Sequence, residues 1–200
     1  MRTPLLLAAA ALIAGPAVAQ QATNAPAGNF RLMDATGKAV QLADYRGKTV
    51  VLEWNNPGCP YVKKHYAGNM QKTQAAARQG GAVWLSINSG APGKQGHMSP
   101  SEARAFVASA KAQPTAYLLD PKGVVGKGYD AKTTPHLYIV DAKGTLVYAG
   151  GIDDKPTPNP ADVNGARNHV LAALAELKAG KAVSVATSRP YGCSVKYADS

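Results

Sequence analysis

Two cysteines, Cys59 and Cys193, are the side chains in this 200-residue chain that best suit covalent chemistry. Two cysteines are too few for a disulfide scaffold, but they can form one bridge or one redox pair. The species that attacks disulfides and peroxides is a thiolate, not a thiol. What matters for each cysteine is therefore whether its neighbours stabilise a negative charge.

Cys59 lies between a turn, residues 55–58 (NNPG), and the expected start of a helix. Pro60 follows it, and proline is favoured at the first helical position because its missing N–H would have no partner there. Amide groups at a helix start stabilise a thiolate, and Lys63, one turn further on, adds a positive charge as an activating residue. We therefore expect a reactive thiol with a lowered pKa. A buried structural cysteine or half of a disulfide is the alternative.

Cys193 lies in the sequence RPYGC of residues 189–193, which follows the last expected helix and is expected to be mobile. It is the only other cysteine that can resolve a mixed disulfide or a sulfenic acid formed on Cys59. Three states stay open: a catalytic bond between the two cysteines, a structural bond, and a free Cys193.

The elements that must position Cys59 alternate between strands and helices. β-Branched and apolar runs predict strands, and amphipathic runs bounded by Gly and Pro predict helices. The expected strands are 30–33, 39–42, 48–54, 82–88, 115–119, 136–140 and 145–148, and the expected helices are 60–78, 99–112, 122–129 (short, or a turn) and 161–178. This order predicts one α/β domain with a mixed central sheet, helices on both faces, an N-terminal β-hairpin and a later antiparallel hairpin at the edge.

The N-terminus resembles a secretory signal peptide. Residues 1–19 combine a positive start, an apolar run too short to span a bilayer, and small residues before a cleavage position. Residues 20–28 are expected to be a flexible leader, 29–180 the folded domain, and 181–200 a tail that carries Cys193. The mature protein is expected to be periplasmic or secreted, without membrane contact after signal removal.

The composition restricts the partners. Hydrophobic residues make up 46% of the chain and charged residues 17%, which excludes disorder by composition. The formal net charge is +10, but the longest basic run is the pair Lys63-Lys64, so we expect a solvated basic surface and no nucleic-acid partner.

Two segments resemble the redoxin, or AhpC/TSA (peroxiredoxin-like), branch of the thioredoxin superfamily. Residues 44–54 (DYRGKTVVLEW) resemble its first central strand, and residues 133–141 (TTPHLYIVD) resemble the segment that carries its cis-proline. The resemblance implies a thioredoxin-like fold with a C-terminal extension. It also implies an exported thiol-disulfide oxidoreductase or peroxiredoxin-like antioxidant protein that needs no cofactor. The expected partners are a thiol or disulfide protein or a small peroxide, and a redox donor protein.

The resemblance also assigns roles to single residues. The catalytic residues it implies are Cys59 as the nucleophile, Cys193 as the candidate resolving thiol and Glu53 as a buried proton acceptor, and the substrate-binding residues are Thr134, Pro135, Pro60 and Trp54. A cis bond before Pro135 would present the main chain of Thr134 to an extended substrate.

The chain departs from two motifs of the superfamily. Val62 replaces the second cysteine of the thioredoxin pattern W-C-x-x-C. Leu52 and Asn56 stand where peroxiredoxins have the Pro and Thr of their peroxide pocket. The resemblance therefore supports a thiol-redox fold more than standard peroxidase activity.

A metal-binding module, or a structural module without turnover, is the competing hypothesis. His65 and His136 are the histidines that, with Cys59, could bind copper or zinc, although Lys63 replaces the second cysteine of the C-x-x-x-C pattern of copper-delivery proteins with this fold. No metal ligand is assigned. His97 and His169 are expected to be surface or packing residues, and Asp153 to lie in a solvated loop.

Overall fold

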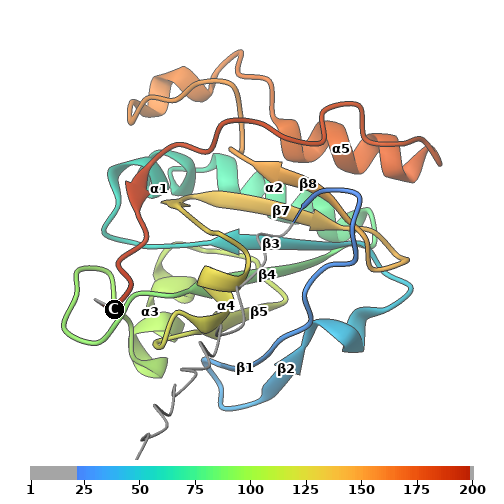
Figure 1. Ribbon diagram of the computed structural model, residues 1–200. Coiled ribbons are helices and arrows are strands. Elements are labelled where there is room, and N and C mark those ends of the chain that lie inside the picture. The colour runs from blue at the N-terminus through green and yellow to red at the C-terminus, as the bar shows by residue number, and fades with distance from the viewer. Residues whose placement is uncertain (1–21, 199–200) are drawn as a thin grey trace, which may run out of the picture.

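The computed structural model describes residues 22–198 (Figure 1). The expected signal peptide and the last two residues lie outside the described residues. The strands are β1 (Arg31–Asp34), β2 (Ala39–Gln41), β3 (Val50–Trp54), β4 (Val83–Asn88), β5 (Ala116–Leu119), β6 (Thr133–Thr134), β7 (His136–Val140), β8 (Leu146–Gly150) and β9 (Cys193–Ser194). The helices are α1 (Pro60–Tyr66), α2 (Asn69–Gln79), α3 (Pro100–Ser109), α4 (Val124–Gly128) and α5 (His169–Lys178), with 3-10 turns at Leu42–Tyr45 and Pro160–Val163.

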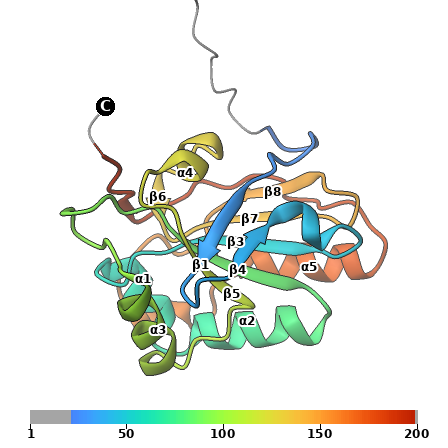
Figure 2. The same cartoon turned by 90° about the horizontal axis from the view of Figure 1, so that it is seen from below.

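A seven-stranded mixed sheet in the order β2-β1-β5-β4-β3-β7-β8 forms the centre of the molecule. Strands β3, β4 and β5 are parallel, and β7 pairs antiparallel with β3. Helices α2 and α5 pack on one face of the sheet, and α4 packs on the other (Figure 2). The fold is thioredoxin-like, as the resemblance implies.

Strand β3 lies between β4 and β7 in the sheet, and all five of its residues are buried. Side chains alternate between the two faces of a strand. Leu52 and Trp54 therefore join the core beneath α4, whereas Val51 joins the core beneath α2 and α5. Glu53 shares the face of Val51, so a carboxylate lies inside an apolar layer.

Two expected helices are shorter in the structure. The helix expected over 60–78 is divided into α1 and α2, because Gly68 has φ 127°, which an α-helix cannot contain. The helix expected over 161–178 begins only at His169, where the Asn168 side chain caps it by accepting a hydrogen bond from the amide of Leu171.

Residues 22–28 are not the flexible leader that the composition predicts. Pro26 forms a bridge with Thr145. On either side of this bridge, the amide of Asn24 donates to the carbonyl of Leu146 and the amide of Ala27 donates to the carbonyl of Gly144. The segment therefore adds to the edge of the sheet beside β8.

The tail is also ordered rather than mobile. It runs back from α5 toward α1 at the other end of the sheet, the red segment in Figure 1. Thr187 bridges Ala149 of β8, and further on β9 pairs antiparallel with β6. This path brings residues near the C-terminus to the start of α1.

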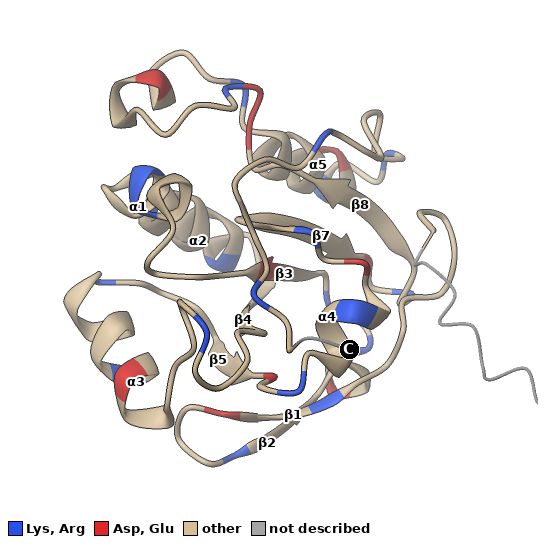
Figure 3. Cartoon of the chain, turned by 60° about the vertical axis from the view of Figure 1, so that its left-hand side comes forward, with Lys and Arg blue, Asp and Glu red and all other residues tan. Residues whose placement is uncertain are grey.

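Lys and Arg are spread over many elements rather than gathered on one of them (Figure 3). This distribution agrees with the expectation of a solvated basic surface. Within residues 22–198, no helix has both the length and the apolar character needed to cross a bilayer.

Candidate functional site

Cys59 is the N-cap residue of α1, directly after the turn that follows β3, and Pro60 occupies the first turn of the helix. The predicted strand–turn–helix arrangement is therefore confirmed. The Cys59 side chain is only 1% exposed. Its sulfur accepts a hydrogen bond from the amide of Val62, and in its neutral form the thiol donates to the carbonyl oxygen of Thr134 at 3.1 Å.

The structure places Cys193 against Cys59, although 134 positions separate them. The amide of Cys193 donates to the sulfur of Cys59 at 3.4 Å, and the two thiols also hydrogen-bond to each other. Both cysteines are free thiols here. Their contact follows from the pairing of β9 with β6, which sets Cys193 opposite Thr134.

The two thiols differ in acidity. Burial raises the pKa of Cys59, but hydrogen bonds from the Cys193 thiol and from the amides of Val62 and Cys193 outweigh it, so the pKa falls below its usual value. Burial, the hydrogen bond to Cys59 and the charge of Cys59 together raise the pKa of Cys193 to about 11. The anion of the pair therefore resides on Cys59 and the proton on Cys193.

The contacts of Cys59 do not support the activating role that the spacing of Lys63 predicts. The side chain of Lys63 is exposed, and it is not among the groups that shift the pKa of Cys59. Main-chain amides and the second thiol stabilise the thiolate instead. Lys63 does lie one turn after Cys59, but it is on the outer side of α1 and its side chain extends into solvent.

Glu53 lies in a hydrogen-bond network of its own and is fully buried. Its carboxylate accepts hydrogen bonds from Asn55 and Tyr66 at Oε1 and from Gln74, Trp84 and Ser86 at Oε2. An ionised carboxylate only accepts hydrogen bonds, and five donors saturate it. None of these five partners is a cysteine, so the structure supports an anchoring role between β3, β4 and the helices rather than the expected proton transfer.

The peptide bond between Thr134 and Pro135 is cis, as the resemblance implies. Thr134 is 2% exposed and its carbonyl oxygen faces Cys59. However, the main-chain edge of Thr134, which was expected to dock a substrate, pairs with Cys193 in β9. The tail of the chain itself therefore occupies this edge.

Of the two remaining expected substrate contacts, only Pro60 is exposed. Trp54 is fully buried, its ring lies tilted against Tyr129 and edge-to-face with Tyr138, and its Nε1 donates to Ser89 Oγ at 3.0 Å. The expectation for Trp54 is wrong because its position on β3 turns the indole into the core.

The histidines of the metal-binding hypothesis have other partners. His65 Nδ1 lies 2.8 Å from Asn69 Nδ2 and its Nε2 lies 3.0 Å from the Tyr191 hydroxyl, while His136 Nδ1 lies 3.1 Å from the Tyr138 hydroxyl. Burial lowers the pKa of both histidines to about 4. Among the described residues, no three or more His, Cys, Asp or Glu side chains form a group that could hold a metal ion.

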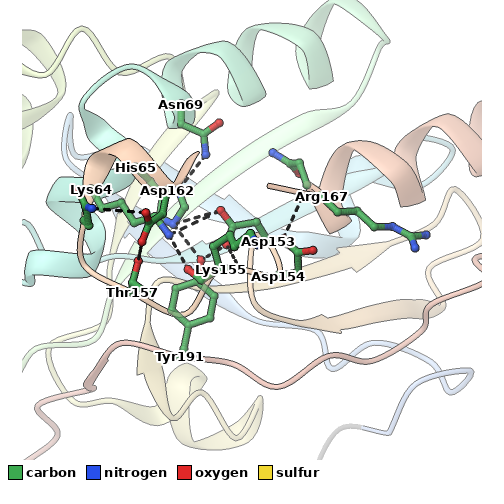
Figure 4. Close-up of polar contacts among 12 residues, drawn as sticks. Lys64, His65, Asn69, Asp153, Asp154, Lys155, Thr157, Asp162, Arg167 and Tyr191 are labelled. Carbon is green, nitrogen blue, oxygen red and sulfur yellow. Dashed lines mark hydrogen bonds and ion pairs between the residues drawn. The ribbon is translucent and has the colours of Figure 1, made fainter. Parts of the chain in front are cut away.

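One buried polar cluster has no counterpart in the sequence expectations. Asp153, expected in a solvated loop, is 4% exposed and accepts hydrogen bonds from the Tyr191 hydroxyl and the Lys155 amide (Figure 4). Lys64, 1% exposed, lies with its Nζ 3.9 Å from Asp153 Oδ2. The sequence carries one signal for a buried lysine: Lys64 directly follows Lys63, and adjacent residues of a helix point to different sides of it.

The sequence profile described as the AhpC/TSA family matches residues 23–149, more than half of the chain. A search of curated proteins finds no match.

The solved structures similar to this one include the following three. An uncharacterized conserved protein from Geobacillus kaustophilus is 28% identical with a TM-score of 0.79, covering 90% of this chain and 94% of that chain. A hypothetical protein from Sinorhizobium meliloti 1021 is 24% identical with a TM-score of 0.79, covering 91% and 98%. The thioredoxin domain of a thiol-disulfide oxidoreductase from Bacteroides vulgatus is 22% identical with a TM-score of 0.53, covering 65% and 89%. These likenesses show the fold.

Proposed function

The chain belongs to the AhpC/TSA family, and from this premise we propose that it is a thiol-disulfide oxidoreductase with Cys59 as nucleophile and Cys193 as resolving thiol. One observation carries the proposal: the two thiols are in contact, and their pKa values are shifted in opposite directions. A nucleophile that is ionised beside a partner that is protonated suits two successive exchange steps.

The proposed reaction transfers two electrons to the substrate. The thiolate of Cys59 attacks one sulfur of a disulfide, whose S–S bond breaks and releases a thiolate. Cys193 passes its proton to that thiolate and attacks the sulfur of Cys59, which releases the second substrate sulfur as a thiolate. The products are a Cys59–Cys193 disulfide and a reduced substrate, and an external dithiol returns the electrons.

Two residues favour disulfides over peroxides as the oxidant. Asn56, at the position of the peroxiredoxin threonine, uses its side chain in the turn, where Oδ1 accepts from the amide of Gly58 at 2.9 Å. Leu52, at the position of the peroxiredoxin proline, is fully buried in the core. With a peroxide, Cys59 would become a sulfenic acid, and attack by Cys193 would release water.

The proposed setting is outside the cytoplasm, with thiol or disulfide proteins as redox partners. The apolar N-terminal segment of residues 1–19 supports export. A compartment of this kind lets a Cys59–Cys193 bond persist between reactions.

Alkylation of the reduced protein at a series of pH values tests the proposal, with each cysteine quantified by mass spectrometry. We expect an apparent pKa for Cys59 below the value of about 8.5 found for an unperturbed cysteine. Oxidation should give an intramolecular disulfide, and Cys59→Ser should abolish disulfide reduction. A Cys59 pKa at or above that of an unperturbed cysteine contradicts the proposal.

A further inference from the structure

We propose that the cysteine pair reacts with small disulfides and excludes extended polypeptides, because the tail of the protein occupies the edge on which a polypeptide would pair. The inference rests on the proposed function and specifies its substrate class. Extended substrates add to a sheet through main-chain hydrogen bonds to an exposed strand edge. The edge next to Cys59 is Thr134, and it already pairs with Cys193.

The tail lies directly on this edge, without space between the two segments. Gly192 has φ 133°, and a Cβ at this residue would lie 2.0 Å from the carbonyl oxygen of Thr134. Because even one methyl group does not fit there, a substrate strand cannot insert between the tail and Thr134. A polypeptide would have to displace the tail.

Hydrogen bonds hold the tail on both sides of β9. Before β9, the amide of Ser188 donates to the carbonyl of Ala149, and the amide of Ala149 donates to the carbonyl of Ala186. After β9, the amide of Val195 donates to the carbonyl of Lys132, and the amide of Ala91 donates to the carbonyl of Lys196. The Tyr197 hydroxyl donates to the carbonyl of Ala131. Releasing β9 therefore means breaking hydrogen bonds on both sides of it, between Ala186 and Tyr197.

A buried attachment lies two residues before Cys193. Tyr191 is 8% exposed, and its hydroxyl donates to Asp153 Oδ1 (Figure 4). Asn69 Nδ2 lies 2.8 Å from His65 Nδ1, so with the amide donating, His65 carries its proton on Nε2 and donates to the Tyr191 oxygen at 3.0 Å.

Helix α1 thus contacts the tail twice, through Cys59 at Cys193 and through His65 at Tyr191. Lys64 adds to the second contact, with its Nζ 5.5 Å from the centre of the Tyr191 ring. Moving Tyr191 out of this cluster would take away the hydroxyl that bonds to Asp153 Oδ1 and His65 Nε2. Leaving buried polar groups such as these without a partner is unfavourable in free energy. The closed position of the tail is therefore the resting state.

A cavity of 590 Å³ lies along the tail just before Cys193 and has room for a small molecule, although neither cysteine is in its lining. Its lining includes Tyr61, Thr133 and Gly192, and the last two directly precede Thr134 and Cys193 in the sequence. Cavities of about 300–1,000 Å³ hold small ligands. For Cys59, which is 1% exposed, to reach such a molecule, the side chain of the partly exposed Cys193 must rotate away. A side-chain rotation of this kind does not require release of β9.

Two disulfides of matched chemistry test this substrate class. The reduced protein is mixed with oxidised glutathione, or with an unstructured peptide whose single cysteine carries glutathione in a mixed disulfide. Formation of the Cys59–Cys193 bond gives the rate constants. We expect the small disulfide to react at least about tenfold faster, a difference of 1.4 kcal/mol in activation free energy. Equal rates, or a faster reaction of the peptide, overturn the inference and leave the proposed function intact. No reaction with either disulfide overturns the proposed function.

Variants that loosen the tail distinguish exclusion of the peptide by the tail from a general preference of the cysteine pair for small disulfides. Tyr191→Phe removes the buried hydroxyl, and Tyr197→Phe removes the contact with Ala131 on the other side of β9. Either change should raise the rate with the peptide several-fold. Tyr197→Phe, which lies outside the lining of the 590 Å³ cavity, should leave the rate with oxidised glutathione within about twofold. Tyr129→Phe, which removes a hydroxyl bonded to Gly28 away from the tail, should change neither rate. A peptide rate unchanged in both tail variants contradicts exclusion by the tail.

Discussion

At the scale of single residues, the proposed chemistry depends on the difference between two sulfur atoms in contact. Both thiols are desolvated, but Cys59 also accepts hydrogen bonds from the amides of Val62 and Cys193. In thiol-disulfide exchange, the sulfur with the lower pKa is the better leaving group. An external thiol that attacks a Cys59–Cys193 bond should therefore attack Cys193, which is also the more exposed sulfur, and release Cys59.

The Cys193 thiol should be needed for the low pKa of Cys59. Cys193→Ala removes the hydrogen-bond donor that lowers this pKa most and keeps the amide, so the pKa of Cys59 should rise. The pH dependence of alkylation measures it. Cys193→Ser retains a donor and should show a smaller rise. If the alanine variant shows an unchanged pKa, the amides alone stabilise the thiolate.

Glu53 should contribute to stability rather than to proton transfer. Glu53→Gln replaces an acceptor oxygen with an NH₂ group that faces buried donors, which should lower the free energy of unfolding by about 2–3 kcal/mol. Chemical denaturation measures the loss. The alkylation profile of Cys59 should not change. A shifted profile with unchanged stability would instead restore the proton-acceptor role that the resemblance implies.

At the scale of elements, the short length of α1 matters for the site. The break at Gly68 lets α2 pack along the sheet, while α1 stays at the end of the sheet, where it contacts the tail at both Cys193 and Tyr191. A single straight helix over 60–78 would keep one direction throughout. The glycine that divides the two helices is thus part of how Cys59 is positioned.

Substituting Gly68 should destabilise the protein through backbone strain alone. A Cβ at Gly68 meets nothing within 4 Å, but its φ of 127° is unfavourable for any other residue. Gly68→Ala should lower the free energy of unfolding by about 1–2 kcal/mol. Gly128→Ala is the matched control, because that position is equally open and has no positive φ. A loss no larger than that of the control would show that the break tolerates a side chain.

Predictions of elements from sequence were accurate where the determining residues are neighbours. The turn of residues 55–58 and Pro60 were sufficient to predict the start of α1 at Cys59. The sequence does not predict the division at Gly68 or the late start of α5. At both places the helical spacing of apolar residues continues in the sequence, although the helix itself is interrupted in the structure.

At the scale of the whole molecule, buried neutral histidines connect folding to pH. Burial holds the pKa of His65 and His136 at about 4, below the value of about 6.5 expected in the unfolded chain. Above pH 6.5 both states are neutral at these residues, and their contribution to stability is complete. As the pH falls from 6.5 to 4, the unfolded chain binds protons that the folded chain does not, and stability is lost.

Urea unfolding should therefore show a decrease in the free energy of unfolding between pH 6.5 and pH 4, of about 2–3 kcal/mol for each histidine. His136→Gln should make the decrease smaller. A free energy of unfolding that does not change over this interval, or that rises as the pH falls, contradicts the buried, neutral state of these side chains.

The sequence by itself determined the position of Cys59 at a helix start, because this depends on residues adjacent in the chain. Its resemblance to the thioredoxin superfamily implied the fold and the cis bond before Pro135. Only the tertiary structure decided that Cys193 lies on Cys59, that Tyr191 is held by Asp153 and His65, and that five donors surround Glu53. These contacts join segments up to 134 positions apart. They form because the folded molecule packs its interior closely and pairs its buried polar groups. Both depend on segments that are distant in the sequence, so no local pattern of residues predicts them.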